Sequence, residues 1–369
     1  MINDIEIKGY RCFNQFEMRR LSRINLLVGT NNSGKTSALE AIYLLATNSD
    51  PQALLKIISG RGEQRFPEQV PGRPIQPEFE ISHLFCGHTI NLGTTLSISA
   101  SNDIPRSTRL SIVEAKPEDN HPQLILMAAT EAPDSVSARL ALSVENETGK
   151  LYSVPLTSRG GIRQDAIQLL TNMHANQPRP SPQSQLSNAQ YVTNASLTSQ
   201  ELSFAWGGIV LTPDEDRVIQ ALKSLDSNIE RIAATTTPFF FGQRGGFVVK
   251  MRNIDQPVPI GSLGDGVWRM LSLAIALIRS RNGILLIDEI DTGLHYTIMS
   301  SMWKMISDAS RAFNIQVFAT THSSDCFRAL ASINADEISI HRIDPSKDRS
   351  IQYSGDEIKA AAEQNIEVR

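Results

Sequence analysis

The chain has 369 residues, which is long enough for one large elaborated domain or two lobes around a buried core. Its 35 Lys and Arg residues against 39 Asp and Glu give a net charge of -4, so bulk charge gives no argument for nucleic-acid binding. Three scattered cysteines fit a reducing compartment better than a disulfide framework, and no apolar run reaches the roughly 18 residues of a membrane span. We therefore expect a cytoplasmic protein that does not insert into a membrane.

The N-terminal part predicts three strands and a helix. Alternating and β-branched apolar residues indicate strands at 4–10, 15–20 and 24–28, and apolar residues at three- and four-residue spacing indicate a helix over 34–46. The segment 48–77 is rich in Gly, Pro and charge, and it predicts a loop with no more than one helical turn.

Residues 29–36, between the third strand and the helix, match the P-loop pattern G-x-x-x-x-G-K-[ST] at every fixed position. Glycines at both ends allow the loop to turn its backbone N–H groups onto phosphates at the start of a helix. We expect Lys35 to reach the β- and γ-phosphates of ATP and Thr36 to bind Mg²⁺. The predicted nucleotide-binding residues of this segment are Gly29, Asn31, Asn32, Ser33, Gly34, Lys35, Thr36 and Ser37. The alternative is a chance Gly-rich turn, which the flanking strand and helix disfavour.

The middle of the chain predicts two insertions. Five β-like runs between 89 and 156, separated by turn residues, predict an antiparallel β-subdomain over 78–160. A helical and loop insertion is expected over 161–258. Within it, the Pro, Ser, Asn and Gln residues of 175–200 predict an exposed, flexible loop, with a partner-binding proline segment as the alternative.

The insertion also carries one amphipathic pattern and two apolar runs. From Pro213 the chain predicts a helix with acidic residues in its first turn and one apolar face formed by Val218, Leu222, Leu225 and Ile229. Short apolar runs at 239–241 and 247–249 predict two strands. His83, Cys86 and His88 have loosely metal-like spacing, but without a second ligand pair we interpret them as strand and turn residues.

The C-terminal third alternates between helices and strands. Helices are expected at 265–278, 294–312, 324–331 and 355–363, and strands at 284–287, 315–319, 337–342 and 351–353. We therefore predict an α/β fold, a P-loop nucleotide-binding core of a mixed sheet flanked by helices, formed by 1–47 and 259–369 in a single ATPase domain.

Two carboxylates follow the strand predicted at 284–287. Its four consecutive apolar residues are typical of a buried parallel strand, which delivers Asp288 and Glu289 at its C-terminal end. This is a Walker B pattern, in which Asp288 holds Mg²⁺ with Thr36 while Glu289 orients and deprotonates the attacking water. Alone the pattern fits the end of any strand, but the P-loop in the same chain favours catalysis.

Two further features point to phosphate. His322 leaves the strand beside the one that carries the acids, where its imidazole is expected to hydrogen-bond the γ-phosphate, with a packing or capping histidine as the alternative. Gly264, Asp265 and Gly266 form a turn directly before an apolar helix, and such a helix start is a second phosphate-binding device. Because one nucleotide has one γ-phosphate, the second device suggests action on a nucleotide held by another copy.

In chain order, the P-loop, this glycine turn, Ile-Asp-Glu and Thr-His resemble the ABC-type ATPases, specifically the group of RecF, SMC proteins and the OLD-like ATPases. Residues 7–13 and 286–295 look especially like OLD-related ATPases. The resemblance covers 1–40 and 259–369. It implies a homodimer, or a higher homo-oligomer, with two ATP molecules between the P-loop of one subunit and the glycine turn of the other. It also implies that Arg11 lies near the phosphates and that the turn containing His295 crosses the interface.

The sequence also departs from that group. Gly264 stands where such ATPases usually have a serine, and Ser262 lies two residues earlier. The Q-loop glutamine has three candidates: Gln64, Gln69 and Gln76. No heptads occupy the middle, so an SMC-type coiled coil is excluded. Only 47 residues follow His322 (369 minus 322), so any nuclease like that of full OLD proteins is expected on another polypeptide.

We weigh three functions. Resemblance to compact ATPases of bacterial anti-phage systems implies a sensor or switch that closes into an ATP-bound dimer and controls a separate effector, a nuclease or toxin. The alternative is a RecF-like ATPase of repair or recombination that binds DNA through Lys8, Arg11, Arg19, Arg20 and Arg23, although a solvated face is the favoured interpretation of such a charge run. A transporter ATPase requires a membrane partner, and the OLD-like phrases argue against it.

Overall fold

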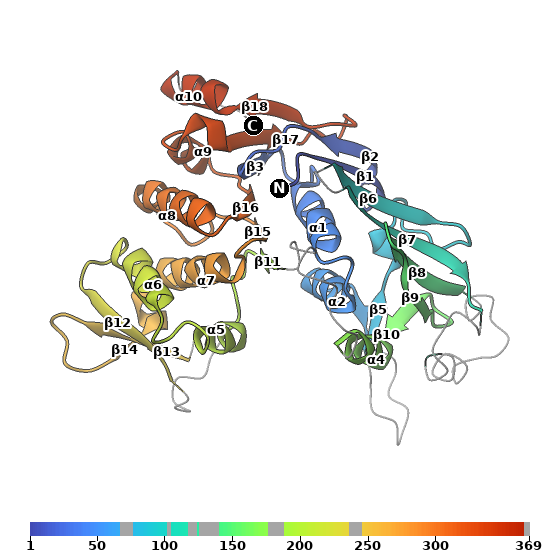
Figure 1. Cartoon of the computed structure of the whole chain (residues 1–369), viewed down its shortest axis with the longest axis horizontal. Coiled ribbons are helices and arrows are strands. Elements are labelled where there is room, and N and C mark those ends of the chain that lie inside the picture. Colours follow the sequence, from blue (N-terminus) through green and yellow to red (C-terminus); the bar gives the residue numbers. More distant parts are fainter. Residues whose placement is uncertain are drawn as a thin grey trace.

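The computed structural model describes residues 1–66, 77–101, 105–116, 124, 140–175, 188–235 and 246–364. Two six-stranded sheets and two three-stranded sheets make up its strand structure in this part of the chain. The helices surround a central sheet, and the second large sheet lies to the right of it in Figure 1. The predicted α/β class with a mixed core sheet is confirmed.

The central sheet is mostly parallel. Its order is β11, β15, β16, β3, β17 and β18, and only the β17–β18 pair is antiparallel. Every residue of β3, β15 and β16 is buried, which explains their near-continuous apolar sequences. The bounds are β3 Ile24–Val28, β11 Ala189–Val192, β15 Ile284–Ile287, β16 Gln316–Thr320, β17 Ile338–Arg342 and β18 Ile351–Ser354.

This sheet separates two hydrophobic cores. Successive side chains of a strand point to opposite faces, so Leu285 and Ile287 enter one core while Leu286 enters the other. On the first face lie α7 (Asp265–Arg279), α8 (Met299–Ala312) and α9 (Ser324–Leu330). On the other, α1 (Lys35–Ala46) packs between the central sheet and the antiparallel sheet (Figure 1).

The antiparallel sheet has the order β2, β1, β6, β7, β8 and β9. Its first two strands come from the N-terminus, so the β-subdomain expected over 78–160 also recruits residues 4–18. Its bounds are β1 Asp4–Tyr10, β2 Phe13–Met18, β6 Thr95–Ser101, β7 Arg106–Glu114, β8 Leu140–Asn146 and β9 Gly149–Pro155. Of the strand expected at 123–129, all but Leu124 lies outside the described residues.

The expectation of a loop over 48–77 is wrong for its first part, which forms α2 (Pro51–Gly60). The Asp50 side chain accepts a hydrogen bond from the Gln52 amide at 2.8 Å, and Pro51 occupies the first helical turn. Leu54, Ile57 and Ile58 are buried. Beside α2 lie α4 (Gln164–Ala175) and a small sheet of β4 (Gln64–Arg65), β5 (Glu78–Glu80) and β10 (Gly161–Arg163).

The insertion differs from the sequence prediction in two places. Within the segment 175–200, expected to be an exposed loop, β11 is a strand of the central sheet that pairs with β15. The helix beginning at Pro213 ends at Lys223, and Ile229 belongs to a following strand rather than to the helix face. The prolines of 178–182 and the strand expected at 239–241 lie outside the described residues.

Two helices and a three-stranded sheet complete this insertion. They are α5 Ser199–Trp206, α6 Pro213–Lys223, β12 Ile229–Ala234, β13 Phe247–Met251 and β14 Val258–Pro259. Near the C-terminus α10 spans Gly355–Glu363 and begins with a capping box at Ser354. The helix expected at 294–312 begins as a 3-10 turn at Tyr296–Ile298 before α8, because the residues after Glu289 form turns. Among the helices of the described residues, none is long and apolar enough to cross a membrane.

Buried polar side chains tie β3 to its neighbours. The Asn25 amide group donates to the carbonyls of Ser22 and Val317, while its oxygen accepts from the Ser339 hydroxyl at 2.9 Å. His341 is fully buried, with Nε2 3.1 Å from Ser339 Oγ and Nδ1 3.1 Å from Ser350 Oγ. Because the Ser339 hydroxyl proton goes to Asn25, His341 Nε2 is the donor to Ser339. The imidazole of His341, protonated at Nε2, therefore completes the network.

Burial lowers the pKa of His341 to about 4, below the value of 6.5 that an exposed histidine has. The unfolded chain therefore binds a proton here before the folded chain does, and stability falls as the pH drops from 6.5 towards 4. We expect the free energy of unfolding to fall by about 2–3 kcal/mol more between pH 7 and pH 4.5 in the wild type than in His341→Gln. Urea unfolding at both pH values measures this, and equal pH dependence of the two proteins would contradict it.

Candidate nucleotide-binding site

The P-loop, residues 29–36, joins the end of β3 to α1. Gly29 and Gly34 have φ angles of 148° and 100°, which favour glycine. A β-carbon at Gly29 would lie 2.5 Å from the Ile343 carbonyl oxygen, and one at Gly34 would lie 2.6 Å from Cζ of Phe13. Both the backbone φ angle and the lack of room for a β-carbon therefore favour glycine at these two positions. Between them Thr30, Asn31 and Asn32 are exposed.

Two polar side chains of the loop point inward. Lys35 is buried, and its Nζ donates to the carbonyls of Gly29 at 3.0 Å and Thr30 at 2.8 Å. Burial lowers the pKa of Lys35, and the nearby carboxylates of Asp288 and Glu289 oppose that shift. The buried Ser33 hydroxyl has no hydrogen-bond partner among the residues that the structure describes. The loop therefore holds an ammonium group and an unsatisfied hydroxyl at the start of α1.

The structure brings Thr36 and Asp288 together. Thr36 Oγ1 lies 3.1 Å from both carboxylate oxygens of Asp288, although the two residues are 252 positions apart. Thr320, the last residue of β16, donates to Asp288 Oδ1 at 2.6 Å and accepts from the Glu289 amide at 2.7 Å. Thr320 was not among the predicted site residues. Its place at the end of the strand beside β15 is the signal that would have found it.

Glu289 follows directly and has a left-handed backbone, with φ of 47°. Its Oε2 accepts a hydrogen bond from Thr292 Oγ1 at 3.2 Å. Asp291 accepts from Thr321 Oγ1 at 2.6 Å, which ties the turn after the acids to the end of β16. His322 comes next, half-buried, at the start of the connection to α9. Since β16 lies between β15 and β3, His322 leaves the sheet between the acids and the P-loop.

The glycine turn, residues 264–266, forms the N-terminus of α7. Gly264 has φ of 91°, and both Gly264 and Asp265 are exposed. A β-carbon on Gly266 would lie 3.2 Å from the Gly293 carbonyl oxygen, so this turn packs against the turn that follows Glu289. Because α7 and α1 contribute to different cores on opposite faces of the central sheet, the glycine turn and the P-loop belong to separate faces (Figure 1).

Arg11, predicted to lie near the phosphates, is paired with acids in this structure, and its contact with a nucleotide stays a prediction. Its side chain is buried, with Nη1 2.6 Å from Glu63 Oε1 and Nε 2.7 Å from Glu40 Oε2. The Arg61 Nε lies 2.7 Å from the other oxygen of Glu40, and Arg61 also donates to the Ser37 hydroxyl at 3.2 Å. Both arginines are thus engaged by acids behind the P-loop. Arg61, which sequence reasoning missed, is the one that touches a predicted nucleotide-binding residue.

Glu40 is the centre of this charge cluster and is almost completely buried. We expect Glu40→Gln to lower the free energy of unfolding by about 3 kcal/mol, because removing one partner of a buried ion pair leaves guanidinium groups without a counter-charge. Thermal or urea unfolding measures the loss. Glu363→Gln, at the exposed end of α10, is the matched control and is expected to change stability by less than about 0.5 kcal/mol. Equal stability of both variants would contradict the prediction.

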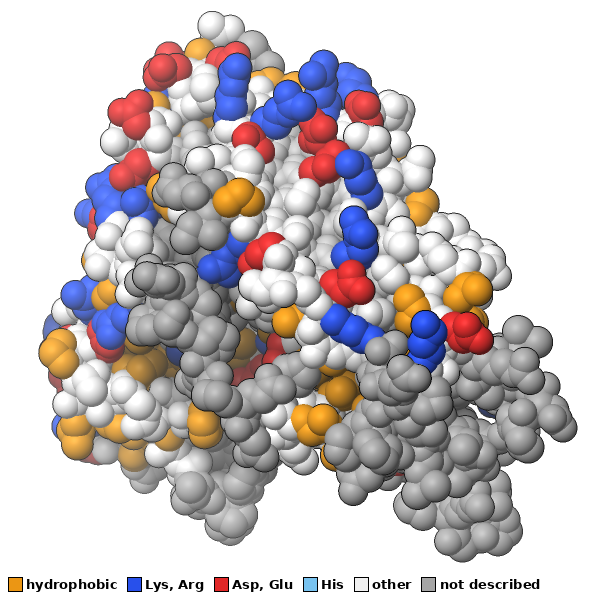
Figure 2. All heavy atoms as spheres, turned by 45° about the vertical axis from the view of Figure 1, so that its right-hand side comes forward, with side chains coloured by type: hydrophobic (Ala, Val, Ile, Leu, Met, Phe, Trp, Pro, Cys, Tyr) orange, Lys and Arg blue, Asp and Glu red, His pale blue; other side chains and the backbone are white. Residues whose placement is uncertain are grey.

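The basic residues proposed to contact DNA are mostly engaged with other groups. Lys8 Nζ lies 2.7 Å from Glu6, Arg19 lies 2.6 Å from Glu17, and Arg23 donates to the Ser310 carbonyl at 3.0 Å. On the face shown in Figure 2, Lys and Arg side chains are interspersed with Asp and Glu. These pairings favour a solvated face over a basic binding stripe.

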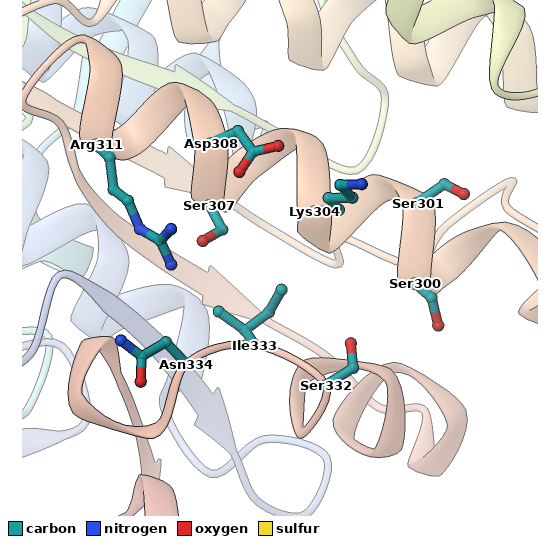
Figure 3. A pocket seen from close by; sticks show the side chains of 9 residues that line it. All are labelled: Ser300, Ser301, Lys304, Ser307, Asp308, Arg311, Ser332, Ile333 and Asn334. Atoms are coloured by element: carbon teal, nitrogen blue, oxygen red, sulfur yellow. The ribbon is translucent and has the colours of Figure 1, made fainter.

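Two hollows flank α8 and lie away from the predicted site residues. One, of about 380 Å³, opens between α8 and the residues that follow α9; Lys304, Asp308 and Arg311 line it from α8, and Ser332 and Asn334 from below (Figure 3). The other, of about 700 Å³, lies between α6, α7 and α8. Neither is lined by the P-loop, by the acids or by His322.

The remaining candidates from the sequence are the Q-loop glutamines and the histidines with metal-like spacing. Gln64 lies in the short strand β4, while Gln69 and Gln76 fall outside the described residues. The rings of His83 and His88 meet edge-on, with their Nδ1 atoms 3.1 Å apart. In the part of the chain that the structure describes, no three His, Cys, Asp or Glu side chains form a group that holds a metal ion.

Comparison with protein families gives two matches. Residues 1–104 match a family described as an AAA ATPase domain, and residues 199–325 match an AAA domain described as a putative AbiEii toxin of a type IV toxin–antitoxin system. The first match contains the P-loop, and the second contains the glycine turn, the acids and His322.

Two individual proteins and one solved structure are also similar to this chain. An ATP/GTP phosphatase of Helicobacter pylori is 22% identical over 356 residues, which cover 90% of this chain and 88% of that protein. The DNA replication and repair protein RecF of Thermomicrobium roseum is 39% identical over 56 residues, only 15% of this chain and 14% of that protein. The structure of the SmcHead bound to the C-winged helix domain of ScpA is 14% identical with a TM-score of 0.47, covering 96% of this chain and 98% of that chain.

Proposed function

Because the chain is an ABC-type ATPase of the RecF, SMC and OLD-like group, we propose that it hydrolyses ATP at a site formed by the P-loop, Asp288, Glu289 and His322. The contact of Thr36 with both carboxylate oxygens of Asp288 at 3.1 Å carries this proposal. It joins the end of the phosphate-binding loop to the end of the strand that bears the acids. The two family matches and the ATP/GTP phosphatase relative support ATP hydrolysis in general terms.

Thr36 and Asp288 fit a magnesium ion. A hydroxyl and a carboxylate oxygen are the hard donors that Mg²⁺ takes, usually together with water and phosphate oxygens. When bound, the ion supplies charge neutralisation at the β- and γ-phosphates. Thr320 would hold the Asp288 carboxylate in place through the 2.6 Å hydrogen bond that it donates to Oδ1.

The remaining residues have complementary roles in this proposal. The Lys35 ammonium group, which donates to two loop carbonyls in this structure, binds the phosphates, and backbone N–H groups between Gly29 and Gly34 surround them. Glu289 accepts a proton from the attacking water. His322 donates to a γ-phosphate oxygen from the neighbouring strand end.

The glycine turn supports a dimer. It is exposed and begins a helix on the face of the central sheet opposite to α1, so it is available to a nucleotide that another copy holds. We propose that two copies close head to tail around two ATP molecules, with His295 on the turn that crosses the interface. The exposed ring of Tyr296, 4.3 Å from that of His295, extends this turn.

We further propose that the closing dimer is a switch for a separate effector protein, a nuclease or toxin, in bacterial anti-phage defence. ATP between two subunits favours the closed state, and hydrolysis releases it, so the nucleotide biases a two-state interface. The match of residues 199–325 to a domain described with a toxin–antitoxin system supports a role in controlling an effector. We favour the switch over a DNA-bound ATPase, because the RecF match covers only 15% of the chain and most of the candidate basic residues are engaged with other groups.

Lys35→Ala tests the site. We expect kcat/KM for ATP to fall by at least about 100-fold, because the substitution removes the ammonium group that would stabilise the transferred phosphoryl group. Phosphate release from purified protein measures it. Lys304→Ala, an exposed lysine on α8, is the control and retains wild-type turnover. Undiminished hydrolysis by Lys35→Ala would remove the site assignment.

Glu289→Gln tests the dimer. Loss of the base slows hydrolysis to a low residual rate while leaving the phosphate contacts intact, so ATP-bound dimers accumulate. We expect light scattering with Mg²⁺ and ATP to give twice the mass of a single chain, and the mass of one chain without ATP. The double variant Lys35→Ala, Glu289→Gln is expected to remain monomeric. A monomeric Glu289→Gln protein in saturating ATP would refute the head-to-tail closure.

A further inference from the structure

Arg269, in the second turn of α7, is a buried arginine that joins three segments of the chain. Its Nη1 donates to the Thr193 carbonyl at 2.6 Å and lies 3.2 Å from Ser196 Oγ, both in the connection after β11. Its Nη2 donates to the carbonyls of Asp288 and Glu289, each at 2.9 Å. One guanidinium group therefore holds α7, the β11 connection and the backbone of both acids.

Keeping a cation at this position is costly. Arg269 is 2% exposed, and its Nε has no hydrogen-bond partner among the described residues. Burial lowers the pKa of Arg269 to about 10, although the carboxylates of Asp288, Asp291 and Glu289 oppose the shift. A well-packed apolar residue fills such a space without that cost, so packing alone does not account for an arginine here.

The backbone that Arg269 holds is strained. Glu289 has φ of 47°, and a residue with a β-carbon pays on the order of 1–2 kcal/mol for that conformation. Both peptide groups that flank its α-carbon are fixed. Arg269 binds the carbonyls of Asp288 and Glu289, and Thr320 Oγ1 accepts from the Glu289 amide at 2.7 Å. Since these peptide groups determine where the β-carbon points, they set the direction of the Glu289 carboxylate.

The same side chain stands one helical turn from the glycine turn. Asp265 is the first residue of α7, and Arg269 follows it by four residues, so both lie on one side of the helix. The glycine turn also packs on the turn after Glu289, where a β-carbon at Gly293 would lie 3.3 Å from Cβ of Asp265. A displacement of the helix start is therefore transmitted to the backbone of Glu289 by two routes.

We propose that Arg269 is a positioning residue that fixes the Glu289 backbone and couples its carboxylate to the glycine turn that faces the partner's nucleotide. This inference rests on the proposed ATPase function. It implies that each subunit's catalytic base responds to whether its own glycine turn is docked on the other subunit's ATP. Arg269 touches no reacting atom and acts entirely through Glu289.

The test compares Arg269→Gln and Arg269→Lys with wild type in steady-state ATP hydrolysis and equilibrium ATP binding. For Arg269→Gln we expect kcat to fall by about 10- to 100-fold, with KM and ATP affinity changed by less than about twofold. Arg269→Lys retains the charge but lacks the planar guanidinium group that reaches four acceptors. Its kcat is therefore expected to lie between the values of wild type and Arg269→Gln. Arg279→Gln, an exposed arginine at the end of the same helix, is the matched control and keeps the wild-type kcat.

A double-variant cycle separates positioning from a merely structural role. If Arg269 acts through Glu289, Arg269→Gln causes no further loss of kcat when Glu289 is already Gln. Wild-type kcat in Arg269→Gln, equal changes in KM and kcat, or an additive loss in the double variant would overturn the inference. Should Arg269→Gln fail to fold, Arg269→Lys gives the same cycle with the same criteria. Hydrolysis that survives Lys35→Ala would instead remove the proposed function, independently of any Arg269 result.

Discussion

The hydrogen bonds between Thr36 and Asp288 are the contact on which the candidate site depends. They exist because β3, β16 and β15 lie side by side in parallel. The polar residues that follow their carboxyl ends therefore lie at the same edge of the central sheet. Thr320, at the end of the intervening strand β16, joins Asp288 and Glu289 in the same network. With another order of parallel strands, the same motifs would lie further apart along this edge.

Two buried arginines bind the segments that carry the residues of this edge. Arg269 binds backbone carbonyls of the acids from the α7 side of the sheet, and Arg11 binds Glu40 on α1 from the other side. Each costs free energy to bury and binds several acceptors, which is the condition under which a charge is tolerated inside a protein. The loop and the acids are therefore supported by separate polar clusters in separate cores.

Much of the fold could be predicted from local sequence. The bounds of β1, β3, β15 and α10 agree with the expected ones, because apolar periodicity and capping residues act over a few neighbouring positions. The helix α2 differs from the predicted loop because the Gly, Pro and charged residues lie mostly after it, whereas the cap at Asp50 and Pro51 starts a helix locally. The strand β11 was missed for a different reason: four residues after a polar segment become a strand only by pairing with β15.

The sequence by itself determined the motifs and their order: the glycines of the P-loop, the apolar strand before Asp288 and Glu289, and the glycine turn before α7. Only the tertiary structure decided which groups these residues meet. In the structure Arg11 pairs with Glu40 and Glu63. Thr320 contacts Asp288, and Arg269 binds the backbone of Glu289. Local conformation depends on neighbours in the chain, whereas the partner of a long polar side chain depends on distances between segments far apart in sequence.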